Sequence, residues 1–445
     1  MKLVKMLTSS VKASVIAFAF FSALSARANS SFDWTGEDGV VTVPDGETAI
    51  VSNCDLTAIA NLTKITCAGT TSRILFRNTE PFTLNAEIDG PGGSENGQAA
   101  IEMTAKTGKI TFAKKVYFNE GRRIILGNAD ILGQFGADRS SVYGSITALA
   151  GCTVDFQNGS KLQREYANRL YGSGTFKFAC KIPTTSAAHH VEVNGCTLVM
   201  CGDNLFNLTG AYVAQTGDEV CTMDLNGHSQ IVGYLTGKYR MTSETPATFT
   251  LGDPNTANST CGLTFEGQAA FEHASPKTTT LSSGVSTTAG GLSVTDGNLV
   301  FKGTASWKGG AVSVTGGKLT LENTIALGSD VDVSVSGSGV LEIPAGVVCA
   351  AKSLTINGDA IDLTEPVSLT DLAATYPDNV SGGGAIGRPP TRYVSLAGND
   401  GADGKTEATA WKTFSFACAY SFPSGSRLIV LPGVYKEGEM TKNGI

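Results

Sequence analysis

The chain has 445 residues and a formal net charge of −7, and only 16% of its residues are charged. Glycine contributes 53 residues and recurs, with threonine and serine, between short apolar runs. This composition is typical of many short strands joined by turns, and it argues against a helical bundle, a disordered chain and a protein that binds nucleic acid.

The first 28 residues have the pattern of a secretory signal peptide. Lys2, Lys5 and Lys12 form a basic region, residues 13–24 form an apolar run, and Ala26-Arg27-Ala28 matches an A-x-A cleavage site. The apolar run is too short to span a bilayer as a helix. We therefore expect cleavage and a secreted or outer-surface protein with no transmembrane segment; an uncleaved signal that serves as an anchor is the alternative. Cleavage would leave 29 basic and 40 acidic residues, so the net charge would become −11.

Ten cysteines follow, and their position within alternating runs is informative. Five of them share the parity of neighbouring apolar residues, which places them on the inward face of strands: Cys152, Cys180, Cys196, Cys221 and Cys261. We expect buried, space-filling thiols, with pairing between neighbouring coils or a surface disulfide framework as alternatives. Cys201 differs in parity from Cys196, so we expect it in a turn.

An internal repeat of about 20 residues is the strongest pattern in the chain. Residues Leu292–Phe301 are echoed by Val312–Leu321 and, with one inserted residue, by Val333–Ile343, and Val191–Met200 has the same shape. Each unit is an alternating strand, a glycine-containing turn and a second alternating strand. A near-constant period favours a solenoid over a hairpin meander, because stacked coils bury one continuous apolar column. We predict an all-β, right-handed parallel β-helix over residues 29–380, with roughly 17 turns, a length on the order of 80 Å and almost no helix between residues 32 and 369.

Two stretches of this region resemble a known family. Residues 194–237, above all Met223–Gly237, and residues 309–346 resemble the passenger-associated repeats of autotransporter proteins. The resemblance therefore covers about residues 194–346. It implies a bacterial surface β-helix with an adhesive or structural role.

A glycine run and a proline pair follow, in Ser381-Gly-Gly-Gly-Ala-Ile-Gly-Arg-Pro-Pro390. This stretch has no apolar periodicity. We interpret residues 381–391 as a linker between two modules.

The remaining residues, 392–445, resemble the opening of the pectin-lyase-like β-helix family. The resemblance rests on Arg392–Thr406, Ala410–Thr413 and Pro432-Gly-Val-Tyr435, and it implies a strand, a polar turn, a capping helix and a first coil. Apolar residues at helical spacing agree with a capping helix near residues 410–421, namely Trp411, Phe414, Ala417 and Cys418. We expect an incomplete second β-helix that belongs to a longer reading frame.

Two carboxylates are the only candidate metal ligands. Asp400 and Asp403 lie in the polar turn and could donate oxygens to calcium, although hydrogen bonds from these side chains to local backbone are the simpler explanation. The chain has no C-x-x-C pair and no H-E-x-x-H motif, and His228 is expected in a turn between glycines. We assign no catalytic residue and no cofactor other than this candidate calcium ion.

These observations leave two hypotheses for function. The first is an exported structural, adhesive or glycan-binding protein whose partner is a polysaccharide or a cell-surface glycan. The second is the N-terminal part of an extracellular polysaccharide lyase or glycoside hydrolase whose catalytic coils lie beyond residue 445. The residues present favour the non-enzymatic hypothesis.

Overall fold

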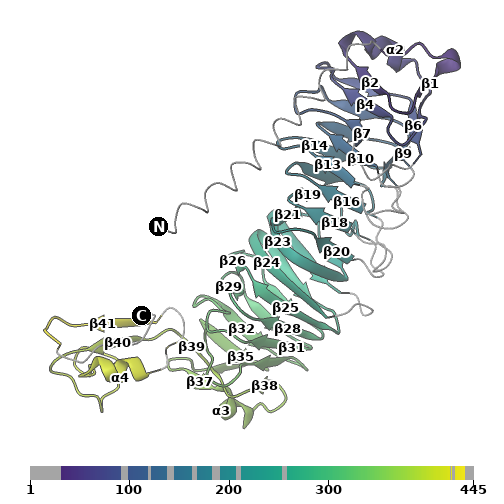
Figure 1. Ribbon diagram of the computed structural model, residues 1–445. Helices are drawn as coiled ribbons and strands as arrows, with labels where there is room; N and C mark the ends of the chain where they lie inside the picture. The colour runs from purple at the N-terminus through teal and green to yellow at the C-terminus, as the bar shows by residue number, and fades with distance from the viewer. Residues whose placement is uncertain are drawn as a thin grey trace, which may run out of the picture.

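The computed structural model describes residues 32–435, apart from residues 92–98, 119–121, 138–144, 163–167, 183–190, 207–211, 253–257, 421 and 423–425. The predicted signal peptide therefore lies outside the described residues. The structure is all-β, only 6% helical, and its parallel strands stack as a β-solenoid of about 12 turns (Figure 1). The predicted all-β, parallel β-helix class is confirmed.

Each turn of the solenoid passes through three faces, and strands on one face pair in parallel with strands of the turns above and below. Face 1 contains β2 (Thr48–Val51), β4 (Arg73–Phe76), β7 (Ala99–Glu102), β10 (Arg123–Leu126), β13 (Ser145–Ala148), β16 (Asn168–Tyr171), β18 (Val191–Asn194), β20 (Tyr212–Gln215), β25 (Thr278–Ser283), β28 (Asn298–Phe301), β31 (Lys318–Leu321), β33 (Val340–Glu342) and β38 (Val380–Ser381).

The other two faces complete each turn. Face 2 contains β5 (Phe82–Leu84), β8 (Ile110–Phe112), β11 (Ala129–Ile131), β14 (Thr153–Phe156), β17 (Thr175–Phe178), β19 (Thr197–Met200), β21 (Cys221–Asp224), β26 (Val285–Ser286) and β29 (Ser306–Trp307). Face 3 contains β1 (Val40–Val43), β3 (Lys64–Cys67), β6 (Glu87–Gly90), β9 (Val116–Phe118), β12 (Gln134–Ala137), β15 (Lys161–Leu162), β22 (Gln230–Val232), β27 (Leu292–Val294), β30 (Val312–Val314), β32 (Asp332–Val335) and β35 (Ser353–Ile356).

Two long strands in the middle of the rod run through all three faces. β23 (Tyr234–Leu251) pairs in succession with β20, β21 and β22, and β24 (Ser259–His273) follows it one turn later. Because these strands bend at the corners without ending, they join the three faces into one hydrogen-bonded unit.

The interior is one continuous apolar core. Successive side chains of a strand point to opposite sides, so in β14 Val154 and Phe156 are buried while Thr153 and Asp155 face outward. Phenylalanines stack from turn to turn: the rings of Phe156 and Phe178 lie 5.0 Å apart between centroids and are nearly parallel. This stacking is what the predicted repeat required of its apolar positions.

The predicted number of turns was too high, because the repeat length is not uniform. Asn298 pairs with Lys318, 20 residues later, as the sequence repeat indicates. Thr48, however, pairs with Arg73, and Asn168 with Val191, at intervals of 25 and 23 residues. The N-terminal turns are longer at their corners, so fewer turns fit; about 12 turns give a rod on the order of 60 Å long.

Both ends of the solenoid carry elements that interrupt strand pairing. At the N-terminal end lie the 3₁₀ turns η2 (Glu37–Gly39) and η3 (Asn53–Asp55) and the helix α2 (Leu56–Ala60), which buries Ile59 and was not expected from the sequence (Figure 1). At the other end, β36 (Asp359–Ile361) pairs antiparallel with β35, and β37 (Val367–Ser368) leads into α3 (Leu369–Ala373). Covered ends protect strand edges that would otherwise pair with other chains.

The segment predicted as a linker is mostly built into the solenoid. Ser381 belongs to β38, which pairs with β33, and β39 (Ala385–Gly387) pairs with β34 (Val348–Ala350). Its glycines serve close packing, since a Cβ on Gly384 would lie 2.5 Å from the side chain of Ile343. The linker prediction missed this because glycine in a tight turn and glycine in a flexible segment look alike in sequence.

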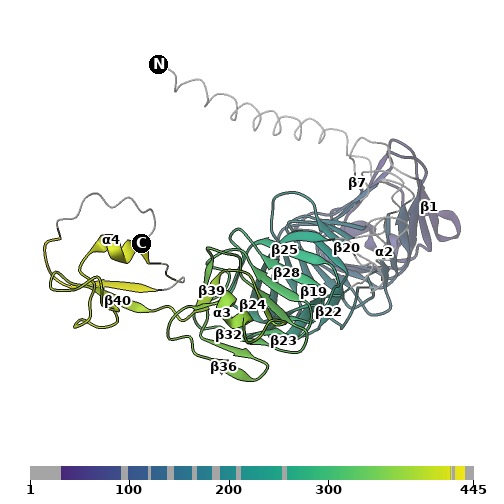
Figure 2. The ribbon, with the colours of Figure 1, turned by 90° about the horizontal axis from the view of Figure 1, so that it is seen from below.

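A small C-terminal module follows (Figure 2). β40 (Thr391–Val394) pairs in parallel with β41 (Arg427–Val430), and α4 (Phe414–Ala419) confirms the helix expected near residues 410–421. Trp411, Ala417 and Val394 form its core, which is separate from the core of the solenoid.

Candidate functional site

The two predicted calcium ligands are occupied by local hydrogen bonds. Asp400 accepts hydrogen bonds from the backbone N–H groups of Lys412 and Thr413, at 2.7 and 2.9 Å, and from the Thr413 hydroxyl at 2.7 Å. Asp403 accepts one from the backbone of Lys405 at 3.1 Å. Within the residues that the structure describes, no group of three or more histidine, cysteine or acidic residues is placed to hold a metal ion. Calcium at Asp400 and Asp403 stays a prediction.

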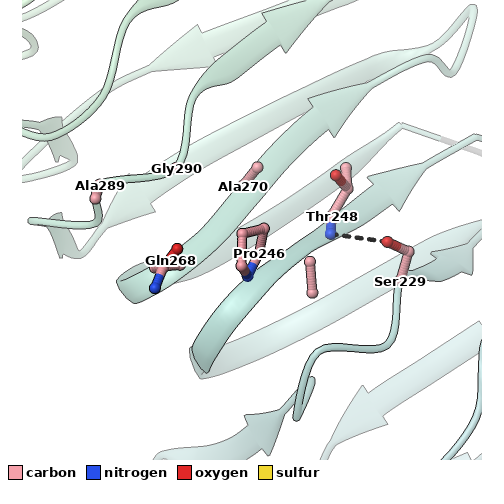
Figure 3. A pocket seen from close by; sticks show the side chains of 8 residues that line it. Ser229, Pro246, Thr248, Gln268, Ala270, Ala289 and Gly290 are labelled. Atoms are coloured by element: carbon pink, nitrogen blue, oxygen red, sulfur yellow. Dashed lines mark hydrogen bonds between the residues drawn. The ribbon is translucent and has the colours of Figure 1, made fainter.

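A shallow groove of about 310 Å³ lies at the corner between faces 2 and 3 (Figure 3). It crosses three successive turns, and β23 and β24 form its centre. Its lining residues are Ser229, Pro246, Ala247, Thr248, Gln268, Ala270, Ala289 and Gly290. The groove exists because small residues occupy this corner in each turn.

The polar groups of the groove are held in place, and none of the lining residues is charged. The Ser229 hydroxyl accepts a hydrogen bond of 3.0 Å from the backbone N–H of Thr248. The Gln268 side-chain amide donates to the Glu244 carbonyl at 2.7 Å. The lining therefore combines fixed hydroxyl and amide groups with small apolar surfaces, which suits an uncharged polar ligand.

A column of hydroxyl groups continues from the groove along face 3. Strand register places Ser293, Ser313, Ser334 and Thr355 at the same outward position in four successive turns, about 4.8 Å apart. One turn before them, Thr250 donates a hydrogen bond of 2.9 Å to Glu272 in the same column. We call Ser293, Ser313, Ser334 and Thr355 the hydroxyl column. It extends the polar, weakly charged surface beyond the groove.

A buried polar cluster inside the solenoid was missed in the sequence. His273 is fully buried at the end of β24; its Nδ1 lies 2.9 Å from the Asp296 carbonyl and its Nε2 lies 3.1 Å from the Thr279 hydroxyl. Ser259 donates to the same Thr279 hydroxyl at 3.2 Å. Burial lowers the pKa of His273 below its ordinary value of 6.5, so the ring is neutral at pH 7. Its signal was available, because His273 has the inward parity of Phe271.

The predicted positions of other side chains are confirmed where they are described. Cys152, Cys180, Cys196, Cys221 and Cys261 are all buried, and Cys201 lies half-buried just after β19. His228 follows a turn and lies 3.6 Å from the Asp203 carboxylate. These results support inward-facing cysteines as space-filling residues.

The junction between solenoid and C-terminal module is an ion-pair network. Glu365 accepts a hydrogen bond from the Arg392 guanidinium, lies 2.8 Å from the Lys405 ammonium, and accepts one of 3.2 Å from the Tyr420 hydroxyl. The Arg392 side chain is only 4% exposed. The network fixes the module to the solenoid end and presents no open surface for a ligand.

Comparison with known proteins found no match to a family model, a curated protein or a solved structure. The resemblances to autotransporter passengers and to the pectin-lyase-like family therefore stay predictions. Over the stretches that the structure describes, no helix is both long and apolar enough to span a membrane.

Proposed function

We propose that this chain is an exported, cell-surface or secreted rod that binds glycans in an adhesive or structural role. The observation that carries the proposal is the uncharged groove at the corner of faces 2 and 3, with the hydroxyl column beside it. Hydroxyl, amide and backbone groups in fixed positions match the dense hydroxyl groups of a sugar chain.

The geometry favours an extended neutral glycan. The groove crosses three turns about 4.8 Å apart, so it can contact a chain that runs parallel to the rod axis over about 10 Å. An acidic polysaccharide would need cationic partners, and none of the lining residues is charged. Weak individual contacts would add up along the rod if several glycan segments bind at once.

A glycan array that includes neutral and acidic polysaccharides, together with a whole-cell adhesion assay, tests the proposal. Ala270→Trp places a bulky ring in the groove, and Thr175→Trp adds the same ring to the outward side of β17 on face 2. We expect neutral glycans to bind the wild type, Ala270→Trp to weaken binding at least about ten-fold, and Thr175→Trp to leave it unchanged.

Two results would refute the proposal. Absence of both glycan binding and cell adhesion would remove the function, and equal loss in the two variants would show that the groove is not the site. Binding of acidic glycans alone would reject the neutral ligand class.

A further inference from the structure

Two of the ten cysteines occupy the same position in successive turns. All ten are free thiols in the structure. Thr197 of β19 pairs in parallel with Thr222 of β21, so Cys196 and Cys221, one residue earlier, are neighbours across the same ladder. Both side chains point inward, each is 1% exposed, and they interact with each other.

The spacing of neighbouring strands suits a covalent bond between these two sulfur atoms. Parallel strands lie about 4.8 Å apart, and the Cα atoms of disulfide-bonded cysteines are usually about 4.4 to 6.8 Å apart. Residues in register on the same side of a sheet also direct their Cβ atoms the same way. Joining Cys196 to Cys221 therefore needs a change of side-chain rotamers and little movement of the backbone.

No other pair of cysteines is placed in this way. Cys152 lies in the same column two turns from Cys196, but Gly174 occupies the turn between them, which leaves about 9.6 Å. Cys67 pairs with Val43, and Cys349 pairs with Ile386. The chain thus carries one inter-turn pair among thiols that otherwise fill space.

We propose that Cys196 and Cys221 form a disulfide that links two successive turns of the solenoid when the chain folds under oxidising conditions. The oxidant is a disulfide such as oxidised glutathione. One protein thiolate attacks it and forms a mixed disulfide while releasing one molecule of thiol. The second cysteine then attacks the protein sulfur of the mixed disulfide and releases the other. Two electrons pass to the oxidant, and the two cysteine protons end on the two thiols that it yields.

The interaction between the two thiols also assigns their roles. The hydrogen bond from Cys196 lowers the pKa of Cys221, and the same interaction, together with burial, raises the pKa of Cys196. Cys221 is therefore the first of the two to lose its proton, and because the thiolate is the nucleophile it forms the mixed disulfide that Cys196 resolves.

Differential alkylation of the folded full chain tests the proposal. One sample is kept reduced, and the other is refolded in a buffer of oxidised and reduced glutathione. Both are denatured in guanidinium with excess iodoacetamide, reduced, and treated with N-ethylmaleimide before peptide mass spectrometry. In the redox-buffered sample we expect at least ten-fold more N-ethylmaleimide on Cys196 and Cys221 than on Cys152 and Cys349, and a linked peptide that is two hydrogens lighter than the sum of its parts.

Variants and controls keep the result interpretable. Cys221→Ser should leave Cys196 labelled by iodoacetamide, whereas Cys152→Ser, a change in the same column, should leave the linked peptide intact. Equal iodoacetamide labelling of Cys196, Cys221, Cys152 and Cys349 in folded, redox-buffered protein would overturn the proposal. A linked peptide that joins either cysteine to a different partner would also overturn it.

Discussion

Replacing Gly310 with alanine should destabilise the solenoid by about 2 kcal/mol. Gly310 lies at the corner between β29 and β30, one turn after Gly290, and a Cβ at this position would lie 2.6 Å from the Gly290 carbonyl carbon and 2.7 Å from the Ala289 oxygen. These neighbours are backbone atoms, so no rotation of a side chain can relieve the contact.

The magnitude combines three effects. Overpacking against backbone costs about 1 to 3 kcal/mol. A shift of the corner would also weaken two hydrogen bonds, from Gly310 to the Thr288 carbonyl at 2.9 Å and from the buried Trp307 indole to the Gly310 carbonyl at 2.7 Å, each contributing about 0.5 to 1.5 kcal/mol. Alanine restricts the unfolded chain and offsets about 0.4 to 1 kcal/mol.

Urea unfolding followed by circular dichroism measures the change, with Gly252→Ala as the matched control. A Cβ on Gly252 would make ordinary contacts, 3.4 Å from the Ile231 and Thr250 methyl groups. We expect the control to match the wild type or to be slightly more stable. If Gly310→Ala is as stable as Gly252→Ala, the argument from close packing at this corner is wrong.

Three further predictions test the core, the buried histidine and the junction. Phe156→Ala should lower the free energy of unfolding by about 3 to 5 kcal/mol, because it removes a fully buried ring stacked on Phe178; a loss under about 1 kcal/mol in urea would contradict this. Because burial lowers the pKa of His273 below 6.5, unfolded chains bind this proton more readily, so stability should fall as the pH drops below about 6.5; equal pH dependence in His273→Gln would exclude this cause. Arg392→Leu should loosen the C-terminal module by about 1 to 2 kcal/mol, a range discounted because the Glu365 side chain is 36% exposed, and hydrogen exchange should then quicken in residues 391–435 but not in β14; unchanged exchange would refute this.

The sequence allowed the C-terminal half of the solenoid to be predicted almost residue by residue. The offset of 20 between Leu292 and Val312 is the observed strand register, and the inserted residue before Val333 shifts that register to 21. Inward cysteines followed from parity alone. Both features depend only on the period of two and on the repeat, which any stacked coil must keep.

Features that depend on corners or on distant turns were not predictable in the same way. The N-terminal corners vary in length, so the repeat there is hidden and the number of turns was overestimated. α2 has only five residues, too few for a helical period, although Ser52 and Asp55 form a capping box before it. The groove requires three turns in known register, and no single stretch of sequence contains it.

The long wrapping strands and the parallel ladders also determine how the rod would respond to force. Hydrogen bonds between turns run along the rod axis, so a pull on its two ends loads one ladder at a time. Val191 pairs with Val213, so a released turn frees about 22 residues, or about 70 Å of extended chain. A tethered rod of this kind would lengthen in discrete steps under tension and dissipate work before its attachment is lost.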